Sequence, residues 1–413
     1  MLTQEQNDAL TLVGPGTPAG ELLRRYWYPV AAAEELTAEQ PTKFVRLLGE
    51  DLVLFKDKSG RVGLLADHCS HRGASLLYGR VEERGIACAY HGWLYDGEGN
   101  ILETPPERND AIMNSVKQTA YPVQELVGLV WAYLGPAPAP VIPHYDIWVR
   151  TGGARRIEWH PVLDNNWFQT IENACDPSHA PILHQDAHSR RAKARPVNTT
   201  RGFIDDQTGF EVWEVPYGLM KKRIFRNGEE DEHPLIFPNI LRVANNTHIM
   251  VPIDDTHTAR IDVIFLPAKE GVPYEEGGVT VKYLPAYKDP PDRSHPHTRW
   301  TLETIAQQDH MVWETQGPIV DRSVENLADG DRGIALLRRV MRENIELVRR
   351  GGGDPLAVVR DPTHPRIDTR WDHDLNSTGG ATGAGRPYGL TTGTLVPREV
   401  PNIETASTGA GSA

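Results

Sequence analysis

Two short stretches of the sequence each combine a cysteine with a histidine, and these side chains are common ligands of transition metals. The stretch HCSHRGASLL contains Cys69 and His71, and the stretch CAYHGW contains Cys88 and His91. Two cysteines and two histidines also form many structural zinc sites, but such sites usually pair like with like. Here each half supplies one ligand of each kind, so a zinc site is the less favoured interpretation.

A site in which each stretch supplies one cysteine and one histidine suits a metal group whose two ends prefer different ligands. Two loops that each donate one thiolate and one imidazole can place both thiolates on one iron and both imidazoles on another. A Rieske [2Fe-2S] cluster requires this arrangement, because two histidines replace two cysteines on one of its irons. Gly73 and Gly92 lie close to the ligands and permit the tight backbone that such loops need. The two stretches therefore predict a Rieske cluster.

A second motif lies later in the chain, in ENACDPSHAPILH. It contains His179 and His184 with four residues between them, and Asp176 three residues before the first. Two imidazoles and a carboxylate form the facial triad of non-haem iron(II) oxygenases. The spacing alone is weak, because a chain with sixteen histidines produces it by chance. Its weight increases beside a cluster that only transfers electrons, because more than two hundred residues follow the cluster-binding region.

Composition limits the possible classes of protein. The chain has 413 residues, of which 39% are apolar and 24% charged, as expected for a soluble protein of two or three domains. A net charge of −13 argues against binding to nucleic acid or to an anionic membrane. No apolar run approaches the roughly 20 residues of a membrane span, and the N-terminus does not resemble a secretory signal. Only three cysteines occur, which favours a reducing cytoplasm as the location.

The predicted elements divide the chain into four parts. TPAGELLRRYWY at 17–28 indicates a short helix that Thr17 caps and Pro18 opens. Short apolar runs separated by turn residues indicate strands from 43 to 136, and a helix is predicted at 331–349. The predicted parts are an N-terminal helical segment packing on the catalytic domain (1–42), a cluster-binding domain with its linker (43–143), a catalytic domain (144–350) and a low-complexity C-terminal extension (351–413).

The sequence resembles the catalytic α subunits of Rieske non-haem iron oxygenases, in particular the phthalate 4,5-dioxygenase branch. The resemblance rests on the cluster motif, on LTLVGPGTPAGELLRRYWYPV near the start and on QQDHMVWETQGPIVDRSVENLADGDRGIALLRR at 307–339, and covers about the first 350 residues. It implies an α+β fold with an all-β Rieske domain and a catalytic domain whose antiparallel sheet is covered by helices. It also implies a homotrimer, sometimes stacked into a hexamer.

The resemblance assigns roles to individual residues. Asn173 and Asp176 match the family's Asn-x-x-Asp, in which the aspartate bridges the two metal centres. The implied ligands are Cys69 and Cys88 on one iron of the cluster, His71 and His91 on the other, and His179 and His184 on a mononuclear Fe(II).

The third ligand of the mononuclear iron is open at this stage. Asp331 is the first choice, because it opens the long helix where the family's ligand aspartate falls. Asp329 is the second choice and Asp309, in QQDH, is the third. Either Asp329 or Asp331 can alternatively serve as a helix N-cap, a position that aspartate favours.

The implied activity is that of a terminal oxygenase. It would use O₂, and electrons from a separate NAD(P)H-dependent reductase, to hydroxylate or oxidatively demethylate an aromatic substrate. The branch that the sequence resembles often acts on aromatic carboxylates, and five cations of the catalytic half are candidates for binding one: Lys221, Lys222, Arg223, Arg226 and Arg242. A solvated basic strand is the alternative for KKRIFR at 221–226. A basic run at 190–195 is either a lid or a solvated loop. The alternatives are an electron-transfer protein or redox sensor without oxygenase activity, and a zinc-stabilised binding protein.

Overall fold

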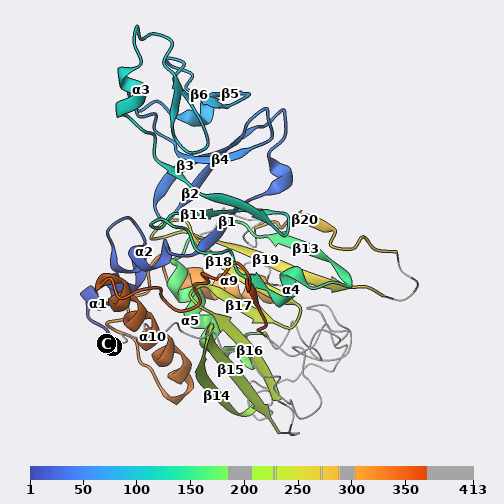
Figure 1. Cartoon of the computed structure of the whole chain (residues 1–413). Coiled ribbons are helices and arrows are strands. Elements are labelled where there is room, and N and C mark those ends of the chain that lie inside the picture. Colours follow the sequence, from blue (N-terminus) through green and yellow to red (C-terminus); the bar gives the residue numbers. More distant parts are fainter. Residues whose placement is uncertain are drawn as a thin grey trace, which may run out of the picture.

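The structure is a computed structural model that describes residues 1–184 and 207–369, except 227, 229, 270, 272, 287, 289–301 and 303. An N-terminal part built from small sheets stands on a larger part that is dominated by one broad sheet with helices on it (Figure 1). This arrangement confirms the predicted α+β class. Among the described residues, no helix has the length and apolar character that crossing a bilayer requires.

The N-terminal part contains three small antiparallel sheets, which confirms the strands predicted between 43 and 136. The first sheet has the order β1-β11-β10, from β1 (Trp27–Ala32), β10 (Val123–Leu126) and β11 (Leu129–Tyr133). The second has the order β2-β3-β4-β9, from β2 (Thr42–Leu47), β3 (Glu50–Lys56), β4 (Val62–Ala66) and β9 (Ala120–Tyr121). The third has the order β5-β6-β7-β8, from β5 (Arg80–Glu82), β6 (Gly85–Ala87), β7 (Leu94–Tyr95) and β8 (Ile101–Glu103), with α3 (Ala111–Ser115) beside it.

Two-residue turns fix the register of the neighbouring strands. Leu47 pairs with Glu50 across the turn that joins β2 to β3, and both residues between them have positive φ, 51° at Leu48 and 76° at Gly49. Positive φ at both central positions matches the right-handed twist of the flanking strands. The same turn geometry joins β10 to β11. Local sequence therefore sets these hairpins.

The first predicted domain boundary lies too late in the chain. The helix predicted at 17–28 is present as α2 (Pro18–Leu23), and the Thr17 side chain accepts a hydrogen bond from the Gly20 N–H as its cap. The chain then forms β1, which pairs with β11, the last strand of the N-terminal part in the sequence. Residues 27–32 therefore belong with the small sheets. Helices α1 (Gln4–Thr11) and α2 pack on the helices of the larger part.

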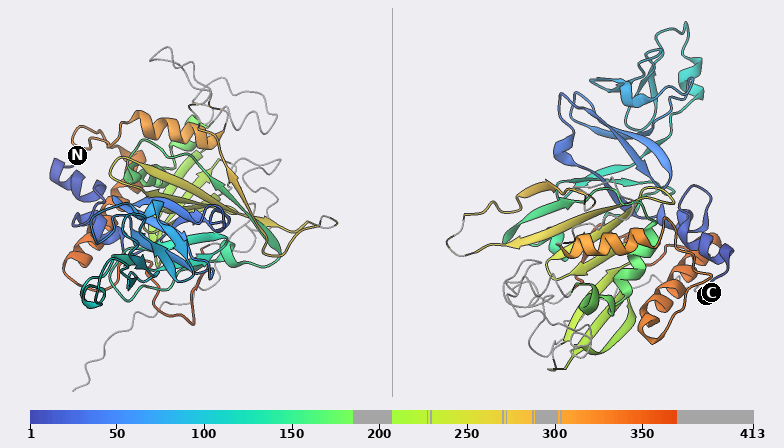
Figure 2. Two further views of the ribbon diagram at one scale, coloured as in Figure 1. Left: turned by 90° about the horizontal axis from the view of Figure 1, so that it is seen from above. Right: turned by 180° about the vertical axis from the view of Figure 1, so that it is seen from behind.

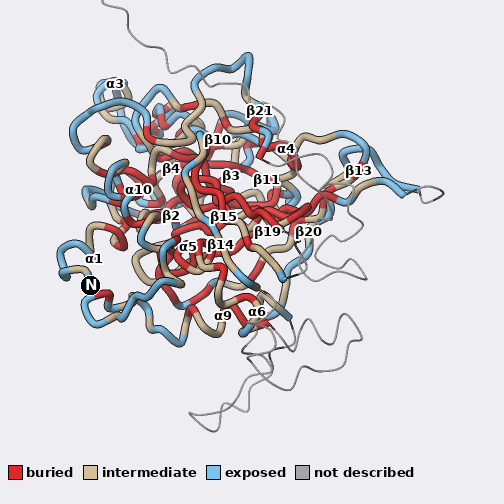
Figure 3. The backbone as a smooth tube through the Cα atoms, turned by 90° about the horizontal axis from the view of Figure 1, so that it is seen from below, coloured by how far each residue is buried: buried red, intermediate tan, exposed pale blue. Residues whose placement is uncertain are grey.

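The larger part contains a sheet with the order β14-β15-β16-β17-β18-β19-β13-β20. Neighbouring strands are antiparallel except for the pair β13–β20. The strands are β13 (Gly153–Trp159), β14 (Gln207–Val215), β15 (Gly218–Phe225), β16 (Glu230–Ile236), β17 (Ile240–Val243), β18 (Asn246–Pro252), β19 (Thr258–Pro267) and β20 (Val279–Tyr283). Strand β11 is buried along its whole length, and β19 is buried from Thr258 to Phe265 (Figure 3).

Helices cover one face of this sheet, where α5 and α9 lie across its middle (Figure 2). Among the residues that the structure describes, this part has the helices α4 (Asp146–Val149), α5 (Trp167–Cys175), α6 (His179–Leu183), α9 (Ile305–Thr315) and α10 (Arg332–Arg349). The predicted helix at 331–349 is thus confirmed as α10, whose apolar side packs against α2 and α5. Because α5 touches both the sheet and α10, its C-terminal end is held from two sides.

A buried ion network fixes α5 against its neighbours. The Glu172 carboxylate on α5 receives Nε–H bonds from Arg322 at 3.0 Å and from Arg338 of α10 at 2.7 Å. Arg322 also donates to the Asn7 side chain of α1 at 2.9 Å, and Arg338 pairs with Glu325. The Glu172 carboxylate and its two arginines therefore join α1, α5 and α10.

Replacing Glu172 by glutamine should destabilise the protein strongly, because Arg322 and Arg338 would lose a buried counter-charge. Removing one partner of a buried ion pair typically costs about 3–5 kcal/mol. Denaturant unfolding of the variant measures the loss. Glu346→Gln is the matched control, because Glu346 forms its ion pairs with Arg349 and Arg350 on the surface of α10. Equal stability of the two variants would contradict a structural role for the network.

The first residues of the predicted C-terminal extension are part of the fold. Residues 351–369 return across the molecule, and β21 (Arg366–Ile367) pairs in parallel with β12 (His144–Tyr145). Thr369 is buried, and its hydroxyl donates to Asp146 at 2.9 Å. The Tyr26 hydroxyl reaches the Leu356 carbonyl at 2.8 Å. The remainder of the predicted extension, 370–413, lies outside the described residues.

Candidate metal centres

Two loops with matching backbone geometry carry the four cysteine and histidine candidates. In the loop after β4, the Cys69 carbonyl accepts from the Gly73 N–H at 2.8 Å. In the loop after β6, the Cys88 carbonyl accepts from the Gly92 N–H at 2.9 Å. Gly73 and Gly92 have φ values of 73° and 74°, a conformation that favours glycine. Each loop is therefore a closed turn whose shape depends on the glycine that the sequence places after the ligands.

The loops separate the sulfur ligands from the nitrogen ligands. Cys69 and Cys88 are 3% and 2% exposed, within a small apolar core of their own. The rings of His71 and His91 lie 4.6 Å apart and are only half-buried. Trp93 stacks on His71 at 4.4 Å with its ring nearly parallel. A group held here would have a buried thiolate end and an imidazole end near the surface.

Hydrogen bonds from the surrounding residues hold the first loop. Gln118 accepts from the Ser70 N–H at 2.8 Å and donates to the Ala66 carbonyl at 2.7 Å. The Tyr95 hydroxyl lies 3.0 Å from Cys69 Sγ. Burial raises the pKa of the Cys69 thiol, so a cation would be needed to keep the thiolate in this core. Hydrogen bonds to the sulfur ligands are one of the factors that set the potential of an iron–sulfur cluster.

A second cluster joins residues from two helices on the face of the large sheet. His179 begins α6, His184 directly follows that helix, and Asp309 lies on α9. Asp309 Oδ1 is 3.1 Å from His184 Nε2 and 3.9 Å from His179 Nε2. One ligand atom from each of the three residues lies within 4.8 Å of the other two. The structure thus brings together the two histidines that the sequence assigned to one site.

The other nitrogen of each ring faces an acceptor. His184 Nδ1 lies 2.9 Å from the Gln308 side-chain oxygen, and His179 Nδ1 lies 3.3 Å from Asp176 Oδ2. An imidazole that donates its Nδ1 proton to such an acceptor presents a lone pair at Nε2. Sequence reasoning missed Gln308, although it directly precedes Asp309.

The electrostatics of the cluster fit a cation. The Nε2 atoms of His179 and His184 both face Asp309 Oδ1, a buried atom without a hydrogen bond of good geometry. Burial alone would raise the pKa of the Asp309 carboxyl, but the close contact with His184, then with His179 and Arg260, lowers it to about 2. The carboxylate is therefore ionised. Two neutral imidazoles and one carboxylate form a donor set suited to a ferrous ion.

Asp331, the first sequence-based choice for the third ligand, does not join this cluster. Its side chain accepts a hydrogen bond from the Ala328 N–H at 2.7 Å, in the turn that precedes α10. Asp329 lies in the same turn and is exposed. Asp331 stands at the N-cap position of α10, although its side chain makes no hydrogen bond to the first turn of that helix. The carboxylate beside the histidines belongs to Asp309, the third choice.

Asp176 ends α5 and starts the turn into α6. Its carboxylate accepts from the Ser178 N–H at 2.6 Å and from the His179 N–H at 3.2 Å, in addition to facing His179 Nδ1. Burial opposes ionisation of Asp176, but the contacts with His179 and the Ser178 N–H lower its pKa. Asn173 lies one turn earlier, and its carbonyl accepts from the Asp176 N–H at 3.0 Å. The bridging role of Asp176 stays a prediction.

A neighbouring cluster of Glu158, His160 and Asp262 also brings three possible ligand atoms together. Here a guanidinium already provides the positive charge, because Arg260 binds both oxygens of Asp262 at 2.9 and 3.0 Å. His248 Nδ1 lies 2.9 Å from the same carboxylate. A divalent ion would have to compete with these contacts, so we assign no metal to this cluster.

Most of the cations suggested for binding a substrate carboxylate have other partners. Arg242 is fully buried and pairs with Asp146, which removes it as a candidate. Arg223 pairs with Asp231, and Lys222 with Glu211 and Glu230. Lys221 is buried and donates to the Ala174 carbonyl at the end of α5 at 2.8 Å, and burial lowers its pKa to about 8.

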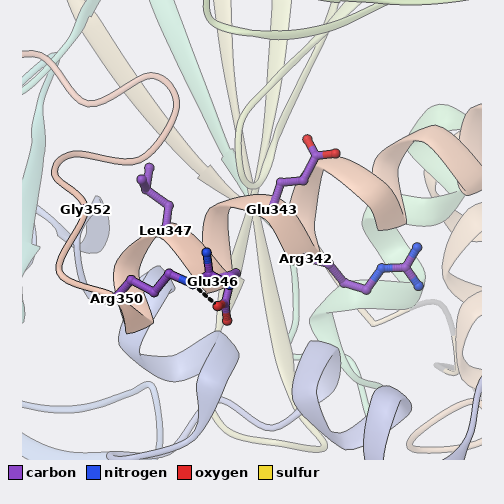
Figure 4. Close-up of a pocket in the computed structure, with 6 residues that line it drawn as sticks. All are labelled: Arg342, Glu343, Glu346, Leu347, Arg350 and Gly352. Carbon is purple, nitrogen blue, oxygen red and sulfur yellow. Dashed lines mark hydrogen bonds and ion pairs between the residues drawn. The ribbon is translucent and has the colours of Figure 1, made fainter.

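Other parts of the surface add little to the site. A surface hollow of about 450 Å³ lies along α10 and is lined by Arg342, Glu343, Glu346, Leu347, Arg350 and Gly352 (Figure 4). None of the candidate ligands lines it. The basic run at 190–195 lies outside the described residues.

Comparisons with known proteins identify the cluster-binding region and the relatives of the whole chain. Residues 26–122 match the family model of the Rieske [2Fe-2S] domain. The chain is 38% identical to the oxygenase subunit of 5,5'-dehydrodivanillate O-demethylase from Sphingobium sp., over 88% of this chain and 84% of that protein. It is 34% identical to the oxygenase subunit of phthalate 4,5-dioxygenase from Pseudomonas putida, over 85% and 88%.

Solved structures share the fold. The oxygenase in the oxygenase–ferredoxin complex of carbazole 1,9a-dioxygenase superposes with a TM-score of 0.58 at 19% identity, over 84% of this chain and 94% of that one. The NdmA protein of Pseudomonas putida CBB5, solved with caffeine, gives a TM-score of 0.54 at 22% identity, over 81% and 94%.

Proposed function

The chain belongs to the oxygenase α subunits of the Rieske non-haem iron oxygenases, and we propose that it oxygenates an aromatic carboxylate at an iron held by His179, His184 and Asp309. The observation that carries the proposal is the convergence of two imidazole nitrogens on a buried, ionised carboxylate oxygen. The Rieske cluster would be held by Cys69, His71, Cys88 and His91.

A ferrous ion bound by these three side chains would supply O₂ activation, because a facial triad leaves coordination positions open. The protein prepares the ligands in advance. The Gln308 side chain is hydrogen-bonded to His184 Nδ1, the Asp176 carboxylate faces His179 Nδ1 at 3.3 Å, and both Nε2 atoms point toward Asp309. His184 is 1% exposed, which keeps bulk water away from that side of the centre.

The substrate class follows from the relatives and from the charge near α5. Dehydrodivanillate and phthalate, the compounds named for two relatives, are aromatic carboxylates. The buried Lys221 ammonium is bonded to a backbone carbonyl, and no carboxylate pairs with it among the described residues. It offers a positive charge that an anionic ring could approach. Hydroxylation and oxidative O-demethylation both remain within this proposal, because the same iron site supports either reaction.

Oxygen uptake with a panel of aromatic compounds tests the function. The assay contains the purified oxygenase, NAD(P)H and a reductase, and compares aromatic acids and methoxy-substituted acids with their uncharged amides. Acid-dependent oxygen consumption with a hydroxylated or demethylated product is the expected result. An iron-free second site, or a protein that only exchanges electrons with the reductase, would support an electron carrier instead.

A separate reductase is proposed as the electron donor. The chain carries neither a plant-type C-x4-C-x2-C ferredoxin spacing nor a nucleotide-binding glycine loop. The half-buried His71 and His91 would lie at the end of the cluster through which electrons leave.

We also propose that electrons pass between subunits of a homotrimer. The β5–β8 sheet stands at the far end of the molecule, with the β2–β4 sheet between it and the large sheet (Figure 1). The cluster loops therefore lie far from α6 and α9 of the same chain, and a neighbouring subunit must bring the two centres together. Asp176 would then accept from His91 of one chain and His179 of the next, since a ligating imidazole usually donates its second N–H to an acceptor.

Mixed assemblies test the path between subunits. Chains with His91→Ala lack an intact cluster, and chains with His179→Ala lack an intact iron site, so each is expected to be inactive alone. Co-assembled, they should regain part of the activity, because an intact cluster can then face an intact iron site. Mixed trimers verified by differential tags, yet inactive, would show that electrons travel within one chain.

A further inference from the structure

A row of charged side chains lies on the large sheet beneath α9. Arg260 and Asp262 are two residues apart on β19, so they project from the same face of the strand. His248 of β18 is directly opposite Asp262 in the register. The His160 N–H donates to the Arg260 carbonyl at 3.0 Å, which places His160 beside the same row. Asp309 of α9 lies next to this row, close to Arg260.

Arg260 bridges two buried carboxylates. Its guanidinium donates from Nε and Nη2 to the two oxygens of Asp262, at 2.9 and 3.0 Å. Its remaining Nη1 faces Asp309 Oδ2 at 3.9 Å. Arg260 is only 4% exposed, so little water screens either contact. The two parallel hydrogen bonds to Asp262 fix the plane of the guanidinium and therefore the position of Nη1.

The two oxygens of Asp309 consequently face different groups. Oδ1 points to the Nε2 atoms of His179 and His184, and Oδ2 points to Arg260. A carboxylate can bind a metal through one oxygen or through both. Here, binding through both would turn Oδ2 away from a buried guanidinium, which would lose part of its counter-charge.

We propose that Arg260 is a positioning residue that restricts Asp309 to a single metal-binding oxygen. The proposal rests on the function proposed above, because it needs Asp309 to be a ligand. Asp262 acts through Arg260 by holding the guanidinium in place. Carboxylate ligands of metal sites are commonly oriented by such outer contacts. Restricting Asp309 to one position keeps a further position of the metal open to O₂ or to substrate.

The test uses cobalt(II) in place of the mononuclear iron, because its visible absorption weakens as the coordination number rises. The band is read as the difference between cobalt-loaded protein and protein without the mononuclear metal, which subtracts the red-brown cluster, and its intensity is expressed per bound cobalt. The key variant replaces the pair as Arg260→Met with Asp262→Leu, which removes the fork as a unit, so that neither of its two charges stays buried without the other. The matched control is Arg223→Met with Asp231→Leu, a second buried arginine–aspartate fork of the same sheet. Neither residue of the control pair belongs to the group formed by His179, His184 and Asp309.

Loss of cobalt absorption intensity in the Arg260/Asp262 variant, with the wild-type band kept in the control, is the expected result. An unchanged band in the Arg260/Asp262 variant would overturn the proposal. If that variant does not fold, Arg260→Gln is measured against the same two outcomes. Asp309→Ala separates this inference from the proposed function: cobalt that still binds with the wild-type band in Asp309→Ala shows that the ligand assignment itself is wrong.

Discussion

Asp309→Ala is expected to abolish turnover and to remove the mononuclear iron, while the [2Fe-2S] cluster remains. The substitution deletes the only carboxylate oxygen toward which both histidine Nε2 atoms point among the described residues. Two neutral imidazoles without an anionic partner hold a ferrous ion poorly, because the hard carboxylate supplies the balancing charge. Iron analysis, the red-brown colour of the cluster and oxygen uptake together measure the result.

Asp331→Ala is the matched control for this experiment. Asp331 is an aspartate of the same domain whose side chain is bonded to the Ala328 N–H in the turn before α10. Its removal should leave iron content and turnover near wild type, at the cost of a weakened helix start. Iron loss in Asp331→Ala with iron retained in Asp309→Ala would reverse the assignment.

Asp176→Asn should nearly abolish turnover although both metal centres stay loaded. Asparagine keeps one acceptor oxygen, which can still accept from the Ser178 N–H at the position of Oδ1, so the turn between α5 and α6 should survive with the loss of the longer bond from the His179 N–H. It lacks the negative charge that faces His179 Nδ1 at 3.3 Å and that would also accept from His91 of a neighbouring subunit. The bridge between the centres would therefore be lost.

The rate at which a pre-reduced cluster is reoxidised in the presence of substrate and O₂ measures this effect directly. Asp176→Asn should slow reoxidation as strongly as it slows turnover. Asp321→Asn is a suitable control, because Asp321 makes a similar turn with the Ser323 N–H at 2.9 Å but is exposed. A wild-type reoxidation rate in Asp176→Asn would leave Asp176 with only its role at the end of α5.

The sequence predicted the cluster loops well because their geometry is local. Each cysteine lies within four residues of its histidine, and Gly73 and Gly92 indicate the closed turns that contain these ligands. His179 and His184 are likewise close in sequence and bracket the short helix α6. Local spacing carries this kind of information, so both pairs could be found without a structure.

The third carboxylate could not be found in the same way. Asp309 is 125 residues beyond His184, and only the packing of α9 against the sheet brings it to the histidines. Asp331 was the first choice because it opens a long helix at the place where the resemblance puts the family's ligand aspartate. Aspartate is also common at the start of a helix for structural reasons alone. The pairing of Gln308 with His184 Nδ1 would have identified QQDH, but that contact depends on the tertiary fold.

Arg242 illustrates the same limit for charge. In the sequence, Arg242 is a candidate for binding an anion. In the structure it is bonded to Asp146 and Thr369, which lie at the two ends of the sequence of the larger part. The early end of the predicted helix at 17–28 has a similar cause. Residues 27–32 pair with β11, about a hundred positions later, and this pairing overrides the helical pattern.

The ratio of iron to acid-labile sulfide in the wild type, in His179→Ala and in Cys69→Ser tests most directly whether one chain holds two separate iron centres. The wild type should contain the irons and sulfides of the cluster plus one further iron per chain. His179→Ala should lose only the further iron and keep all sulfide. Cys69→Ser should lose the sulfide and the cluster irons and keep the further iron. Loss of both centres in either variant, with the fold intact by circular dichroism, would contradict two independent sites.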